Sequence, residues 1–116
     1  MVSYKIYADI RISIDKVYRL EFNTLNEIYL NYSTRNVIGL YLSHQKWDRL
    51  PNEIKLFNKL EYINITDNKR IKRFPKILYN LRNLHTIIAE ENNFILDEND
   101  VLYIKHIPKF VYNKLK

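Results

Sequence analysis

The sequence predicts an α/β fold in which short parallel strands, each followed by a short helical segment, stack in register. Segments that begin at Val37, Leu60 and Leu84 share one pattern of apolar positions, at offsets of 23 and 24 residues. Each segment then carries an amide side chain at the same place, and two of the three share a tail that begins with proline. A single unit of this kind cannot bury its apolar side chains, so the units are expected to stack on a shared core.

Each repeat begins with a short strand. Leu40 and Leu42 are separated by one residue, and the same alternation recurs at 63–65 and 87–89. A period of two places the large side chains on one face of a strand. The sequence therefore predicts three parallel strands with their aliphatic residues facing one interior.

The second half of the first two repeats predicts a short helical or 3-10 segment. Pro51 and Pro75 are each followed by apolar residues at every third position. A spacing of three is typical of 3-10 turns, and the fixed φ of proline suits the first position of a helical segment.

The combined pattern L-x-x-L-x-L, amide, L-P-x-x-I-x-x-L resembles the leucine-rich repeat family in its short form, over residues 37–94. The resemblance implies a solenoid with short parallel strands on a concave face and short helical or 3-10 segments on a convex face. It also implies that Asn68 and Asn92 turn inward and bind backbone groups of neighbouring units, because an unpaired buried backbone group costs about 1–3 kcal/mol. Gln45 is one methylene longer, so looser geometry is expected there.

The N-terminal third is interpreted as a β-rich cap over one end of the repeats. Residues 4–14 alternate between apolar and polar side chains, which is typical of a half-buried strand, and residues 18–22 are its expected antiparallel partner. Residues 25–30 repeat the L-x-x-I-x-L spacing, and residues 25–36 are interpreted as an abbreviated repeat unit or a capping strand. A separate docking element is the alternative interpretation of this third.

The C-terminal part is expected to close the other end of one domain. An acidic stretch between residues 90 and 100 is interpreted as a solvated surface, residues 101–107 as a last strand, and residues from 108 onward as a basic tail. No linker divides the chain. The predicted organisation is one domain, 1–116, with a cap at 1–36, repeats at 37–94, and a C-terminal cap and basic tail at 95–116.

The composition argues against catalysis. The chain has no cysteine and a single glycine, Gly39, which excludes thiolate chemistry and glycine-rich phosphate loops. None of His44, His85 and His106 stands at a spacing typical of a metal site, and no paired acid and base residues are apparent. We therefore expect no enzyme activity, no cofactor, no metal and no small-molecule substrate.

The favoured function is a protein–protein interaction on the concave strand face. Side chains between the inward aliphatic positions are expected to form that face, and tyrosines with a polar surround are enriched in protein interfaces. The candidate partner-binding residues are Tyr29, Tyr41, Ser43, His44, Tyr62, Asn64, Thr66, Asp67, Thr86, Ile88 and Glu90. The prediction places the acidic residues Asp67, Glu90 and Glu91 on this face, with Glu27 if residues 25–31 form a strand, and no lysine or arginine.

Two other functions stay open. The formal charge of +6 permits nucleic-acid binding, and the densest positive cluster is the basic rim formed by Lys69, Arg70, Lys72 and Arg73. Alternatively, the first 36 residues dock a larger enzyme complex and the repeats select its substrate. Binding of nucleic acid through the basic rim would be marked by an affinity that falls steeply with salt.

The amino-acid composition predicts an intracellular protein. Ile, Asn, Lys and Tyr supply 52 of the 116 residues, all with AT-rich codons, and this bias with short leucine-rich repeats is similar to the repeat gene families of insect poxviruses and other large DNA viruses. Products of AT-rich protists or bacteria share the bias. We expect a cytoplasmic monomer or weak homodimer without a membrane span. If the protein is viral, the resemblance implies that it interacts with a host protein.

Overall fold

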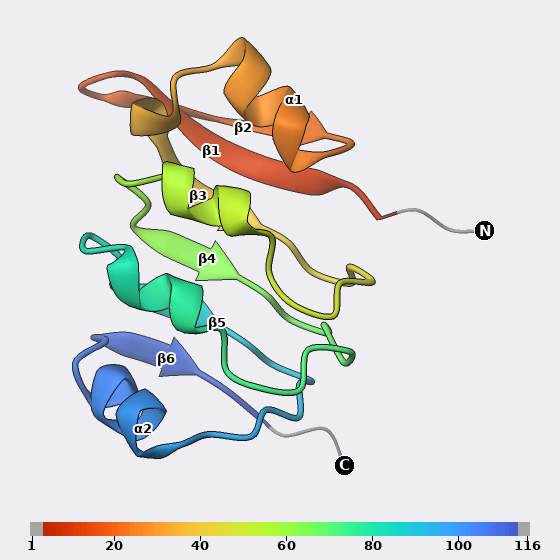
Figure 1. The fold of residues 1–116 in the computed structure, drawn as a ribbon. Coiled ribbons are helices and arrows are strands. Elements are labelled where there is room, and N and C mark those ends of the chain that lie inside the picture. Colours follow the sequence, from red (N-terminus) through yellow and green to blue (C-terminus); the bar gives the residue numbers. More distant parts are fainter. Residues whose placement is uncertain (1–3, 114–116) are drawn as a thin grey trace.

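An antiparallel hairpin forms one edge of a six-stranded sheet. The computed structural model describes residues 4–113, and its strands lie in the order β2-β1-β3-β4-β5-β6 (Figure 1). β1 (Ile6–Ser13) pairs antiparallel with β2 (Lys16–Phe22) on one side and with β3 (Val37–Tyr41) on the other. The alternation of residues 4–14 therefore does mark a strand, and its buried members are Ile6, Ala8 and Ile10.

The remaining strands are parallel to β3. β4 (Tyr62–Asn64), β5 (Thr86–Ile88) and β6 (Lys109–Val111) follow in sequence order. Leu40 and Ile63 are register partners, and Ile63 in turn is the partner of Ile87. The three segments singled out by the sequence pattern are thus neighbours in one sheet.

Short helices connect the strands and cover one face of the sheet. Residues 4–113 contain two α-helices, α1 (Leu25–Asn31) and α2 (Glu98–Lys105), and three 3-10 helices, η1 (Thr34–Asn36), η2 (Asn52–Leu56) and η3 (Lys76–Asn80). In Figure 1, η2, η3 and α2 lie on the same side of the strands. None of the described helices is both long and apolar enough to cross a membrane.

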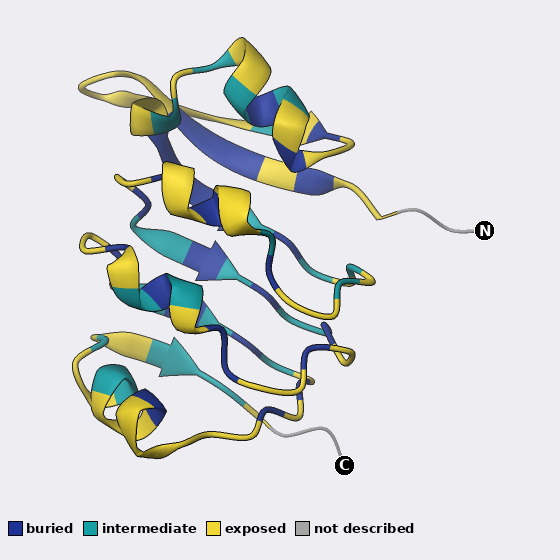
Figure 2. Ribbon diagram, in the orientation of Figure 1, coloured by how far each residue is buried: buried dark blue, intermediate teal, exposed yellow. Residues whose placement is uncertain are grey.

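The core lies between the sheet and this layer of helices. Leu40, Ile63 and Ile87 are at most 1% exposed, and they pack in one cluster with Phe57 and Phe74 from the connecting segments. Figure 2 shows buried residues within the strands, and η2 and η3 each contribute one buried residue, Ile54 and Leu78.

Two buried asparagines tie neighbouring strand ends together. Asn68 Nδ2 donates to the carbonyl oxygens of Leu42 (3.0 Å) and Ile65 (2.8 Å), and Asn92 Nδ2 donates to that of Ile65 (3.0 Å). Asn92 Oδ1 also accepts from the backbone N–H of Asn68 at 2.7 Å. The inward orientation expected for these amides is confirmed, whereas the half-buried Gln45 binds the carbonyl two residues before it, at 3.1 Å.

The predicted leucine-rich repeat solenoid is wrong. The chain forms a small compact α/β domain with one mixed sheet, in which two of the six strands belong to the antiparallel hairpin. Its radius of gyration is 13.8 Å, close to the roughly 13 Å expected of a globular domain of this length. An extended solenoid does not form because the chain contains too few repeat units. The hairpin and α2 close the core at its two ends before an extended stack can form.

The second correction concerns residues 25–31, which form helix α1 and not a strand. Leu25 and Ile28 face the core at helical spacing, and the Thr24 side chain accepts a hydrogen bond from the backbone N–H of Glu27 at the start of the helix. Tyr29 consequently lies outside the sheet face, packed against the core, with its hydroxyl donating to Asn26 at 2.7 Å.

A third correction concerns residues 101–107, which belong largely to helix α2. Asp97 and Asp100 form a reciprocal capping box at its N-terminus. The acidic stretch is therefore not simply a solvated surface, because Asp100 is 2% exposed and is paired with Lys76 at 3.0 Å. The last strand comes later, in β6, which includes Lys109. The lysines at 114 and 116 of the expected tail lie outside the described residues.

Candidate functional site

One face of the sheet carries no helix of the described part of the chain, and we call it the open face. Two rows of register partners cross it. The first row is Arg19, Asp9, Gly39, Tyr62, Thr86 and Lys109, and the second is Glu21, Tyr7, Tyr41, Asn64, Ile88 and Val111. Each row runs through all six strands, so residues far apart in the chain become neighbours on one surface.

A buried carboxylate lies on the open face, on β1. Asp9 is only 5% exposed, although it belongs to the polar set of the alternating strand β1. Arg19 Nε donates to Asp9 Oδ1 at 2.9 Å, and the Tyr41 hydroxyl donates to Oδ2 at 2.9 Å. The Tyr62 hydroxyl donates to the same Oδ2. Four side chains from β1, β2, β3 and β4 therefore meet at this carboxylate, and we call them the Asp9 cluster.

The protonation of the Asp9 cluster follows from these contacts. Burial alone raises the pKa of Asp9, but the hydrogen bonds from Arg19, Tyr62 and Tyr41 outweigh it and leave the pKa below its ordinary value. Burial and the hydrogen bond to Asp9 raise the pKa of Tyr62 and of Tyr41. At neutral pH the cluster therefore holds an ionised carboxylate and two protonated phenols.

Arg19 also fixes the position of the Tyr41 ring. Its Nη2 donates to the Tyr41 hydroxyl at 2.7 Å, and its guanidinium carbon lies 4.3 Å from the centre of that ring. The Tyr41 and Tyr62 rings meet edge to face, with centroids 6.0 Å apart. Both aromatic side chains are held by contacts at the ring and at the hydroxyl, so their conformations are set within the protein itself.

Gly39, the one glycine of the chain, makes room for this arrangement. It is the register partner of Asp9 on one side and of Tyr62 on the other. The Tyr62 ring crosses over Gly39 to reach the carboxylate, and a Cβ at position 39 would lie 2.8 Å from Tyr62 Cδ2 and closer still to two other ring atoms. Any side chain larger than hydrogen would therefore displace the ring.

A cleft lined by aromatic side chains adjoins the cluster. It has a volume of about 400 Å³ and is lined by Tyr4, Lys5, Tyr7, Tyr41, Ser43 and His44. The Tyr4 ring lies 4.8 Å from the His44 ring, and the Tyr7 hydroxyl donates to Glu21 at 3.1 Å. The cleft is large enough for one side chain of a partner.

The strand ends next to this cleft carry an ionic group. His44 Nδ1 lies 2.6 Å from Asp67 Oδ2, and Lys69 Nζ lies 3.3 Å from Asp67 Oδ1. Burial raises the pKa of Asp67, but the hydrogen bonds from His44 and Lys69 lower it by more. His44, Asp67 and Glu91 occupy the same place in three successive turns, and each has a positive φ between 55° and 63°.

The other candidate residues of the open face lie where the register places them. Ser43 Oγ donates to Asn64 Oδ1 at 3.2 Å, and the same oxygen accepts from the backbone N–H of Thr66 at 2.9 Å. Ile88 and Thr86 are half-buried in β5, and the carbonyl of Glu90 accepts from the backbone N–H of Asp67 at 3.0 Å. The structure thus brings together every candidate partner-binding residue except Tyr29.

The sequence-based charge distribution needs correction. The open face was expected to hold no lysine or arginine, but Arg19 on β2 and Lys109 on β6 both belong to its first row. Asp9 and Arg19 were absent from the candidate residues, because strand alternation alone gives Asp9 the appearance of an ordinary solvated position. The signal was the register, which requires knowledge of which strands are neighbours.

The basic rim is less available for phosphate contact than its sequence suggests. Lys69 pairs with Asp67, Arg70 Nε lies 3.1 Å from Asp48 Oδ1, and Lys72 Nζ donates to the backbone carbonyl of Lys69 at 3.3 Å. Of the four cations in the rim, Arg73 alone has none of these contacts within the described residues. Two of the four charges are therefore already offset by carboxylates.

Within residues 4–113 no group of three or more His, Cys, Asp or Glu side chains could hold a metal ion.

Comparison with known proteins adds no family to this description. The chain matches no protein-family model, no curated protein and no solved structure. The site must therefore be interpreted from its own geometry.

Proposed function

We propose that this protein is a non-catalytic binding module whose open face docks against a partner protein. The observation that carries the proposal is the Asp9 cluster, which holds Tyr41 and Tyr62 in fixed conformations. Rigid aromatic side chains bury a large area on binding while losing little conformational entropy. The adjoining aromatic cleft supplies a place where one anchoring side chain of the partner would be buried.

The contacts of the described residues favour this function over nucleic-acid binding through the basic rim. Ionic steering by the rim is weakened because Asp67 and Asp48 already pair with Lys69 and Arg70. The open face combines tyrosine, threonine, asparagine and isoleucine side chains with the paired Asp9 and Arg19, and its other row charges, Glu21 and Lys109, lie on the edge strands β2 and β6. Such a mixture of aromatic and neutral polar groups suits a protein surface.

The test needs a substitution that alters the open face without disturbing the Asp9 cluster. Alanine at Tyr41 or Tyr62 is unsuitable because it would leave the buried Asp9 without its hydrogen-bond donors. Ile88→Glu places a charge on the open face at a residue outside the cluster. Leu30→Glu is the matched control, since Leu30 is 76% exposed on α1.

The experiment is a chemical cross-linking capture from an extract of cells that express the protein, with wild type and both variants at equal thermal stability. We expect the same specific partner with wild type and Leu30→Glu, and at least a tenfold loss with Ile88→Glu. Cross-links from that partner should map to the open face. A partner retained equally by all three proteins, or lost only with Leu30→Glu, would refute the proposal.

A further inference from the structure

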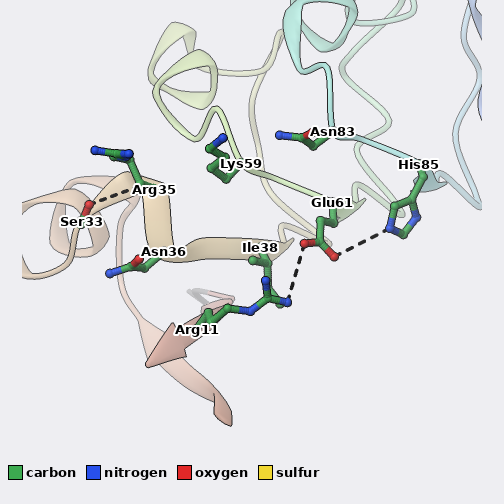
Figure 3. A pocket seen from close by; sticks show the side chains of 9 residues that line it. All are labelled: Arg11, Ser33, Arg35, Asn36, Ile38, Lys59, Glu61, Asn83 and His85. Carbon is green, nitrogen blue, oxygen red and sulfur yellow. Dashed lines mark hydrogen bonds and ion pairs between the residues drawn. The ribbon is translucent and has the colours of Figure 1, made fainter. Parts of the chain in front are cut away.

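A second cavity lies at the end of the sheet where the parallel strands begin. It has a volume of about 680 Å³ and is lined by residues from four segments of the chain, whose side chains Figure 3 shows around it. The charged side chains that line it are Arg11, Arg35, Lys59 and Glu61, together with His85. Neither Tyr41 nor Tyr62 reaches this cavity, so it is distinct from the site described above.

Backbone hydrogen bonds of the sheet bring these side chains together. The N–H of Glu61 donates to the carbonyl of Ile38 at 2.8 Å, and the N–H of His85 donates to the carbonyl of Glu61 at 2.9 Å. The beginning of β3 and the residues that precede β4 and β5 are thereby placed side by side. Arg11 joins them because β1 runs antiparallel to β3, so the end of β1 meets the beginning of β3.

The charges in the cavity are unequally paired. Arg11 Nη2 lies 3.8 Å from Glu61 Oε2, and His85 Nε2 lies 3.9 Å from Glu61 Oε1. For Arg35 and Lys59, the part of the chain that the structure describes offers no carboxylate within 4.0 Å. Three permanent cations against one carboxylate give the cavity two positive charges when His85 is neutral.

We propose that this cavity binds a phosphate monoester. A dianion would neutralise its two surplus charges, and guanidinium groups bind phosphate oxygens through paired N–H donors. Arg35 and Lys59 would make the main contacts because neither is engaged by a carboxylate of the described chain. The amide of Asn83 and the hydroxyl of Ser33, which also line the cavity, supply neutral polar contacts.

The proposal predicts the direction in which substitution of Glu61 changes the phosphate affinity. Its carboxylate repels an anion, forms a weak ion pair with Arg11, and lies 3.9 Å from His85. Replacement by the neutral amide in Glu61→Gln would remove the repulsion and free Arg11. The phosphate affinity of this variant should therefore rise, by about threefold or more.

The test is a titration of the full-length protein with methyl phosphate at pH 8, followed by ¹⁵N–¹H NMR. Shift changes should centre on Arg35, Lys59 and Glu61. In the double variant Arg35→Gln/Lys59→Gln the affinity should fall by about tenfold or more. The matched control, Lys69→Gln/Lys72→Gln in the basic rim, removes the same charge and should bind as wild type does.

Two further ligands test which kind of phosphate compound the cavity binds. Dimethyl phosphate, a monoanion, should bind at least about fivefold more weakly than methyl phosphate. A phosphoserine tripeptide that binds more tightly than methyl phosphate would identify a phosphoprotein as the source, and one that binds no more tightly would identify a small phosphorylated molecule. The proposal is overturned if methyl phosphate causes no shifts, if Glu61→Gln weakens binding, or if the rim variant loses as much affinity as the cavity variant.

Discussion

Asp9, Gly39 and Tyr62 occupy one row across three adjacent strands, and the chemistry of each depends on the other two. Adjacent strands are about 4.8 Å apart, so the Tyr62 hydroxyl can reach Asp9 only by passing directly over the strand between them. A residue without a side chain is required at the crossing point, and Gly39 provides it. Its φ is not positive, so this glycine serves close approach and not an unusual backbone conformation.

Substitution of Gly39 by alanine is expected to destabilise the protein by about 1–3 kcal/mol, because the new methyl group overlaps the Tyr62 ring. Displacement of the ring would also break its hydrogen bond to Asp9. Urea unfolding gives the free-energy change. In a Tyr62→Ala background the same substitution should cost less than half as much, since the overlap is gone. Equal costs in the two backgrounds would show that Gly39 does not serve the Tyr62 ring.

At the scale of elements, the strand and 3-10 segments of the middle of the chain follow from local periodicity. The apolar alternation at residues 40–42, 63–65 and 87–89 places strands in the right region, and Pro51 and Pro75 do precede η2 and η3. These features are local, and the same pattern appears more than once, so the sequence suffices to predict them.

The segments of the two described α-helices were predicted as strands, because their apolar spacings also fit strands. Residues 24–27 read Thr-Leu-Asn-Glu and residues 97–100 read Asp-Glu-Asn-Asp, and both have the polar residue three positions apart that is typical of a capped helix start. N-terminal capping favours the helical conformation in both segments, because Thr24 and Asp97 each accept a hydrogen bond from a backbone N–H at the helix start. The Asp9 cluster could not be predicted, since its residues are separated by up to 53 positions.

The asparagine ladder carries the clearest prediction about an element. Asn68→Ala leaves the Leu42 carbonyl without its side-chain donor and removes one of the two side-chain donors of the Ile65 carbonyl, so it is expected to cost about 1–3 kcal/mol. Asn80→Ala, at the exposed end of η3, removes the same amide and should change stability by less than about 0.5 kcal/mol. Chemical denaturation of both variants provides the comparison. Equal midpoints would contradict the role given to Asn68.

At the scale of the whole molecule, the Asp9 cluster joins the antiparallel hairpin to the parallel strands. Its members come from β1, β2, β3 and β4, so one group of hydrogen bonds spans the change in strand direction. Such a joint keeps the hairpin part of one sheet and keeps the open face continuous. The fixed tyrosines and the compact architecture therefore have a common origin.

This joint also makes the stability of the protein depend on pH. The pKa of Asp9 is lower in the folded protein than in the unfolded chain, so the unfolded chain binds more protons in acid. The contribution of Asp9 is fully present above the pKa of the unfolded chain. It is lost as the pH falls through the lower pKa of the folded protein. Acid should therefore weaken the link between the hairpin and the parallel strands.

The most direct test of the account is a ¹³C NMR titration of the Asp9 carboxyl carbon in wild type and in Tyr62→Phe. We expect the wild-type carbon to titrate below the ordinary aspartate value of about 3.9, and the variant carbon to titrate at a higher pH because one hydrogen-bond donor is missing. A wild-type carboxyl that titrates at or above the ordinary value, or a midpoint that the loss of the Tyr62 hydroxyl leaves unchanged, would contradict the claim that an ionised Asp9 fixes the open face.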